Sequence, residues 1–141
     1  MAYWLFKTEA DAWSWDQQKT KGATGEEWTG VRNFQARSNM RKMQKGDRGF
    51  FYHTGDEKRV VGIVEVIAEA HAESKDPAWE CVDLKAVADV PNPVTLVAVK
   101  AEPTLKDMVL VKNSRLSVQP VNDTEWALVC KMGGVDPAKL K

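Results

Sequence analysis

Trp28, Arg32 and Asn33 place an aromatic ring, a cation and an amide within one short stretch of the chain. Trp28 lies in a glycine-rich loop, where a tryptophan has less reason to be core than on a strand, so its ring is available for stacking. Arg32 and Asn33 stand at an expected helix start, where free N–H groups favour an anion, although Asn33 can equally be only the cap. Arg37 either binds a phosphate or lies in solvent. A stacking ring beside cations suits a nucleotide ligand.

Two expected strands end in further side chains of this kind. Lys7 and Thr8 are the polar end of the first strand, and Trp4 on the same strand faces either a pocket or the core. Tyr52 and His53 end a second strand. His53 is either a hydrogen-bond donor to a ligand or simply an exposed tip.

Arg115, Ser117 and Gln119 alternate with Leu116 and Val118, so the three polar side chains share one face of an extended segment. That face is either the solvated side of an edge strand or the border of a pocket. The remaining tryptophans fall outside these stretches, and we assign them to structure: Trp13, Trp15, Trp79 and Trp126.

Signs of catalysis or metal binding are scarce. The chain has two histidines, His53 and His71, and contains no CxxC, HExxH, GxSxG or GxxxxGK spacing, so we expect no zinc site, no cofactor and no catalytic residue. Glu9 and Asp11 are better explained as caps or solvated carboxylates than as a catalytic pair. The enzyme alternative would use His53 with Glu9 or Lys7 for acid–base chemistry.

The composition predicts a globular protein with one hydrophobic core. The chain has 141 residues, 43% hydrophobic and 28% charged, with 20 basic and 20 acidic side chains. A net charge of zero removes the simplest argument for nucleic-acid binding, but residues 28–54 carry six cations against Asp47 alone. Such a run is more often a solvated face than a binding surface.

Cellular context follows from cysteine usage and from the absence of targeting signals. Cys81 and Cys130 lie far apart in apolar patterns, which favours buried thiols of a reducing compartment over a disulfide. The first residues show no basic leader before an apolar run, and no stretch reaches the ~20 apolar residues of a membrane span. We therefore expect a cytoplasmic monomer with no membrane contact.

The element pattern mixes several strands with short helices. Alternating or β-branched residues predict strands, and capping residues predict helices, as follows: strands at 3–8, 48–54, 59–68, 82–90 and 115–119, and helices at 15–19, from 34, near 96, at 105–108 and from 123. Pro91-Asn92-Pro93 is expected to break the fourth strand. Because crossover helices are missing between the central strands, we predict an α+β fold with a mixed β-barrel and short flanking helices.

The distinctive segments form an ordered set. They are YWLFKTE at 3–9, WTGVRNFQAR at 28–37, GD at 46–47 leading to FYH at 51–53, VVGIVEV at 60–66, and SRLSVQP at 114–120. Together they closely resemble the EVE domain family across nearly the whole chain. Ala10, where the family commonly has proline, and Thr54, where it usually has serine, leave the resemblance intact.

The resemblance implies a single PUA-like domain over residues 1–141, related to YTH readers of methylated adenine in RNA. It also implies non-catalytic binding of a modified base, above all a modified cytosine in DNA, with RNA as the second candidate. The alternative is a PUA-like nuclease or small hydrolase using the same pocket.

A reader of a modified base needs an aromatic pocket for the flipped base and cations for the neighbouring phosphates. We therefore predict that Trp4, Trp28, Tyr52 and His53 converge on one concave pocket, and that Arg32, Arg37 and Arg115 rim it. A loop tryptophan such as Trp28 should contribute little to the core.

Overall fold

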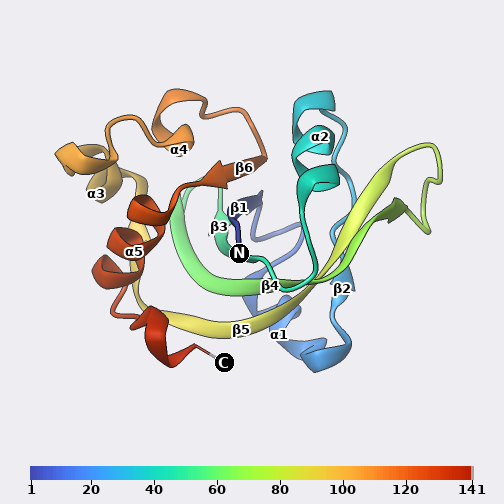
Figure 1. The fold of residues 1–141 in the computed structure, drawn as a ribbon, viewed down its shortest axis with the longest axis horizontal. Coiled ribbons are helices and arrows are strands. Elements are labelled where there is room, and N and C mark those ends of the chain that lie inside the picture. Colours follow the sequence, from blue (N-terminus) through green and yellow to red (C-terminus); the bar gives the residue numbers. More distant parts are fainter. Residues whose placement is uncertain (141) are drawn as a thin grey trace.

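Six strands and five short α-helices make up the fold in the computed structural model, which describes residues 1–140 (Figure 1). The strands are β1 (Tyr3–Thr8), β2 (Glu26–Glu27), β3 (Arg48–His53), β4 (Arg59–Ala72), β5 (Glu80–Thr95) and β6 (Val118–Val121). The α-helices are α1 (Trp15–Thr20), α2 (Phe34–Lys42), α3 (Leu96–Ala101), α4 (Val109–Lys112) and α5 (Asp123–Met132). Short 3-10 turns lie at Gly22–Thr24, Pro103–Leu105 and Pro137–Lys139.

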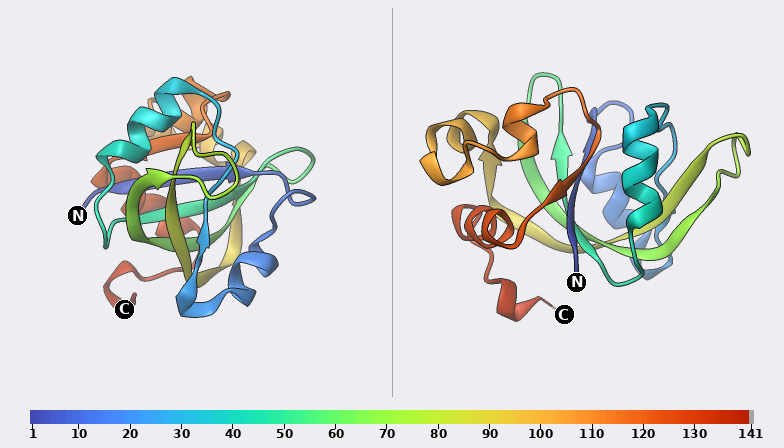
Figure 2. Two further views of the ribbon diagram at one scale, coloured as in Figure 1. Left: turned by 90° about the vertical axis from the view of Figure 1, so that its right-hand side faces the viewer. Right: turned by 45° about the horizontal axis from the view of Figure 1, so that its top comes forward.

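The strands form one mixed sheet in the order β2-β5-β4-β3-β1-β6. Only the β1–β3 pair is parallel among the strands of residues 1–140. The long strands β4 and β5 bend strongly (Figure 2), and register shifts along their ladder allow this curvature. The predicted mixed α+β fold is confirmed, with the sheet curved but open between its edge strands β2 and β6.

Side-chain alternation along the strands divides the core into two clusters. Trp4, Phe6 and Phe51 belong to the first cluster, which α1, α2 and the Trp28 loop cover. Leu5 and Phe50, on the opposite face, belong to the second cluster, covered by α3, α4 and α5. Figure 1 shows these two groups of helices on opposite sides of the sheet. Side chains on opposite faces of the sheet therefore cannot line the same ligand site.

The helix starts follow the predicted caps. Asn33 accepts a hydrogen bond from the Ala36 backbone N–H, and Ser14 and Asn122 each form a complete capping box. The predicted buried stripe of α2 is also confirmed, since Ala36, Met40 and Met43 are at most 2% exposed.

Two predicted strand boundaries are wrong. β5 continues through Pro91 and Pro93 to Thr95 because both prolines occupy exposed positions where the ladder with β4 shifts register. Residues 115–117 are not a strand, since β6 begins at Val118 and contains Pro120. Among residues 1–140, no helix combines the length and apolarity needed to cross a membrane.

Candidate nucleic-acid interface

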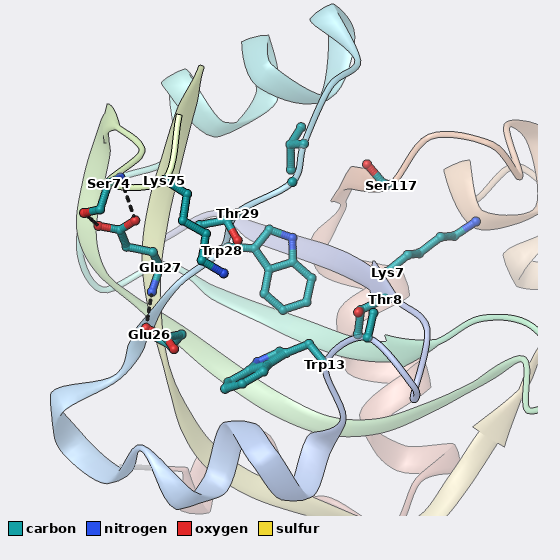
Figure 3. A pocket seen from close by; sticks show the side chains of 13 residues that line it. Lys7, Thr8, Trp13, Glu26, Glu27, Trp28, Thr29, Ser74, Lys75 and Ser117 are labelled. Atoms are coloured by element: carbon teal, nitrogen blue, oxygen red, sulfur yellow. Dashed lines mark hydrogen bonds between the residues drawn. The ribbon is translucent and has the colours of Figure 1, made fainter. Parts of the chain in front are cut away.

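A cavity of about 540 Å³ opens beside the Trp28 loop, on the first-cluster side of the sheet (Figure 3). This volume is within the ~300–1,000 Å³ typical of small-molecule pockets. Its walls come from the end of β1, the turn before α1, the β2 loop and the β4–β5 turn. The lining residues are Lys7, Thr8, Ala12, Trp13, Glu26, Glu27, Trp28, Thr29, Gly30, Val31, Ser74, Lys75 and Ser117.

Trp28 is one aromatic wall of the cavity. Its backbone N–H donates to the Val82 carbonyl at 2.8 Å, which ties the loop to β5. The ring meets Phe6 and Phe51 edge to face, with interplanar angles of 67° and 82°. Trp28 is only 6% exposed and belongs to the first core cluster, so the prediction that it contributes little to the core is wrong.

Trp13 is the second aromatic wall, and the sequence analysis missed it. Its indole N–H donates to Gln18 Oε1 at 2.8 Å, and Gln18, fully buried, donates in turn to the Leu84 carbonyl. This chain of hydrogen bonds fixes the Trp13 ring beside Trp28 (Figure 3). The available signal was its position in the short connection between the polar end of β1 and the helix that covers the same face.

Lys7, Thr8 and Ser117, three of the residues predicted to contact nucleic acid, line the cavity and give it polar groups. The Lys7 ammonium donates to the Ser114 carbonyl at 2.6 Å and lies 5.6 Å from the Tyr52 ring centre. Partial burial lowers the pKa of Lys7. The Lys7 backbone N–H donates to the Ser117 carbonyl, so both residues are held at one edge of the cavity.

Arg32 holds the Trp28 loop in place through Glu73. The Glu73 carboxylate is 1% exposed and accepts hydrogen bonds from Arg32 Nη1 at 2.8 Å and from the Gly30 N–H at 3.0 Å. The Arg32 guanidinium lowers the pKa of Glu73. Gly30 has φ of +86°, a conformation that favours glycine, so the loop depends on both the glycine and the buried carboxylate.

The predicted convergence of four aromatic side chains is wrong. Trp4 shares the first face with Trp28, but its buried indole N–H donates to Asp47 Oδ2 at 3.1 Å, and it does not line the cavity. Tyr52 points to the second cluster because it follows Phe51, and strand side chains alternate. Burial raises the pKa of Tyr52 to about 12.

His53 is buried outside the cavity and both of its ring nitrogens are engaged. Nε2 accepts a hydrogen bond from the Trp15 backbone N–H at 3.0 Å, which leaves the proton on Nδ1 to donate to Glu57 Oε1 at 2.9 Å. The ring therefore anchors the start of α1 to the end of β3. This arrangement gives the enzyme alternative no support from His53.

Five other predicted residues do not line the cavity: Arg32, Asn33, Arg37, Arg115 and Gln119. The three arginines predicted to rim the pocket are therefore not among its walls. Asn33 caps α2. Gln119 is buried and donates to the Leu116 carbonyl at 2.8 Å, because β6 begins only at Val118 and turns this side chain inward. Arg115 is exposed on the segment before β6.

Nearly the whole chain matches one known protein family. The model of the EVE domain matches residues 2–132. The chain belongs to the EVE domain family. The predicted family is therefore confirmed.

Individual EVE proteins are similar over most of this chain. Protein Atu2648 from Agrobacterium tumefaciens is 56% identical, with 100% of this chain and 99% of that chain covered and a TM-score of 0.95. Human THYN1, solved in complex with DNA containing 5-methylcytosine, is 26% identical over 97% of this chain and 100% of that chain, with a TM-score of 0.86. Thymocyte nuclear protein 1 of Danio rerio is 32% identical over 78% of this chain, which spans 58% of that protein's length.

The fold likeness extends to the YTH domain of the Zygosaccharomyces rouxii MRB1 protein. That domain is 15% identical, covers 96% of this chain and 88% of its own, and has a TM-score of 0.61. The likeness shows the fold alone, and it confirms the predicted PUA-like class.

Three of the six cations in residues 28–54 of this EVE domain are paired with acids from the β4–β5 ribbon. Arg41 binds Glu80, Arg48 binds Glu65 at 3.3 Å, and Arg32 binds Glu73. Arg37 lies outside the cavity, with its guanidinium stacked 4.8 Å from the Phe34 ring centre. The sequence could not show this pairing because the acids are 17 to 41 residues away along the chain.

Proposed function

We propose that this EVE domain binds nucleic acid carrying a modified base, without making or breaking a bond, and that the base enters the cavity between Trp13 and Trp28. The observation that carries the proposal is the pair of fixed tryptophans on one cavity of about 540 Å³. A base lifted out of its strand loses stacking, and aromatic walls replace it. The THYN1 complex with 5-methylcytosine DNA supports modified cytosine as the ligand.

The polar groups around the cavity suit the edge of a base. Thr8 and Ser117 offer hydroxyls that both donate and accept, and Glu26 offers an acceptor for an exocyclic amine. Lys7 and Lys75 bring positive charge to opposite sides of the opening (Figure 3), where the phosphates of a bound strand would pass.

Fluorescence anisotropy with a panel of labelled oligonucleotides tests the proposal. The panel contains single-stranded and duplex DNA, and RNA of the same sequence, each with one unmodified cytosine, one 5-methylcytosine or one N6-methyladenine. We expect tightest binding to a strand carrying a modified cytosine, and mass spectrometry should find that strand unchanged after long incubation. Equal affinity for the unmodified strand would contradict base reading, and catalytic amounts of product would favour the enzyme alternative.

A further inference from the structure

Four potential metal-ligating side chains meet on one face of three neighbouring strands. Cys81 and Asp83 are two residues apart on β5 and therefore share a face. His71 on β4 pairs across from Cys81, and Glu27 on β2 pairs across from Asp83. One ligand atom of each residue lies within 4.8 Å of the others. The sequence predicted no zinc site because these residues share no motif spacing.

Two distances within this cluster are close to those around one tetrahedral ion. Cys81 Sγ lies 3.8 Å from His71 Nε2, and zinc bonds of ~2.3 Å to sulfur and ~2.0–2.1 Å to nitrogen would separate these atoms by about 3.6 Å. His71 Nε2 lies 2.8 Å from Asp83 Oδ1, and this distance must widen by about half an ångström around zinc. Both of these side chains are partly exposed, which allows the movement.

The ring of His71 is already oriented as a ligand. Its Nδ1 lies 2.9 Å from the Ala72 carbonyl, which can only accept, so Nδ1 carries a proton, and Nε2 is the nitrogen nearer to Asp83 and Cys81. Histidines that bind metals commonly donate their second N–H to a carbonyl or carboxylate in this way. A backbone carbonyl thus holds the imidazole in the tautomer that metal binding needs.

The charges of the cluster also favour a cation. The carboxylates of Glu27 and Asp83 lie close to the fully buried Cys81 thiol and to the His71 ring, and they bring negative charge to one small volume. A divalent ion would neutralise this charge and would stabilise the thiolate form of Cys81.

We infer that Glu27, His71, Cys81 and Asp83 form a binding site for a divalent transition metal ion, with Zn²⁺ the best match. One sulfur, one imidazole nitrogen and carboxylate oxygens are a donor set that zinc accepts, whereas Mg²⁺ and Ca²⁺ prefer oxygen alone. Glu27 also accepts hydrogen bonds from Ser74, so it exchanges this partner for the metal (Figure 3). The inference does not depend on the proposed function.

Cobalt(II) spectroscopy of the purified, chelator-treated protein tests this inference. A thiolate bound to Co²⁺ gives a charge-transfer band in the near ultraviolet, which we expect in the wild-type protein and not in Cys81→Ser. Cys130→Ser is the matched control, because Cys130 is also a buried thiol but lies on α5 in the other core cluster. This control should keep the band.

A second variant is needed because Cys81→Ser replaces a buried side chain and can itself disturb the fold. His71→Ala changes a partly exposed side chain, and we expect it to weaken Zn²⁺ binding at least about tenfold in competition with a chromophoric chelator. Added Zn²⁺ should raise the melting temperature of the wild-type protein and leave that of His71→Ala unchanged. Absence of the cobalt band in the wild type, or its persistence in Cys81→Ser, would overturn the site.

Discussion

Trp28 and Trp126 are both nearly buried, yet only one of them faces a cavity. Trp126 is stacked against Tyr3 and Phe50, with ring centres 4.4 and 4.2 Å away and interplanar angles of 9° and 24°. The side chain is 3% exposed and does not line the cavity beside the Trp28 loop. Trp28 touches Phe6 and Phe51 only edge to face, and it lines the cavity. The orientation of the neighbouring rings, rather than the degree of burial, distinguishes a core tryptophan from a wall for a ligand.

The difference follows from what covers each face of the sheet. On the second face, α5 brings Trp126 down onto β1 and β3 and closes the core. On the first face, the Trp28 loop and the turn before α1 stand apart around the cavity. The first face can therefore bind a ligand, while the second serves stability.

Replacement of Trp126 should produce the largest loss of stability. Trp126→Ala removes a stacked side chain that is 3% exposed, so we expect a loss of about 3–5 kcal/mol in the free energy of unfolding. Urea denaturation followed by circular dichroism measures it. A loss below about 1 kcal/mol would mean that the second face is not the closed core described above.

Trp13→Ala should instead act on binding. A base stacked on an aromatic side chain contributes ~1–3 kcal/mol, so affinity for the preferred modified strand should fall about 5- to 150-fold. Trp13 is only half-buried, but its loss leaves the buried Gln18 Oε1 without a donor, so we also expect a moderate fall in the melting temperature. Trp13 is a cleaner test than Trp28, whose replacement would also open the core.

Trp79→Ala is the matched control for this variant. Trp79 is also half-buried, but it stacks on Phe34 outside the cavity. We expect it to keep the affinity of the wild type. Equal losses in both variants would place the ligand elsewhere.

Glu73→Gln should loosen the loop that carries Trp28. The substitution removes the ion pair between Glu73 and Arg32. Because the Arg32 side chain is partly exposed, we expect a loss of about 1 kcal/mol in the free energy of unfolding at neutral pH. The pKa of Glu73 is lowered in the folded state, so its contribution is present above the unfolded pKa of about 4.3 and disappears as pH falls through the folded value. The urea denaturation curves of the wild type and of Glu73→Gln should therefore differ at pH 7 and become the same at acidic pH.

The smallest expected effect concerns the salt dependence of binding. Affinity for the preferred strand should fall with salt, and Arg115→Ala should reduce the slope of log K against log salt by about 1 if Arg115 contacts one phosphate. Lys100→Ala, an exposed cation on α3, should leave the slope unchanged. An affinity that does not change with salt concentration would contradict contact between the protein and the phosphates.

Local signals in the sequence predicted much of this structure. Asn33 and Asn122 cap helices as their side chains indicate, and the mixed sheet follows from the strand pattern. Long-range partners were not predictable in the same way. Nothing local shows that the Trp15 backbone N–H donates to His53, or that Glu73 pairs with Arg32, because each contact joins segments brought together only by the fold.

The candidate site was predicted only in part for the same reason. Lys7, Thr8, Trp28 and Ser117 line the cavity, as their segments suggested. Tyr52 was assigned to it although alternation after Phe51 turns it to the other face. Trp13 was missed because it belongs to no distinctive segment.

The most direct test follows the indole N–H signals of the six tryptophans by ¹H–¹⁵N NMR while a single-cytosine oligonucleotide is added. With 5-methylcytosine in the strand, we expect the Trp13 and Trp28 signals to shift and that of Trp126 to stay in place. The unmodified strand should leave all three nearly unchanged at the same concentration. Trp13 and Trp28 signals that do not respond to the modified strand, or that respond equally to the unmodified one, would contradict base binding between these two rings.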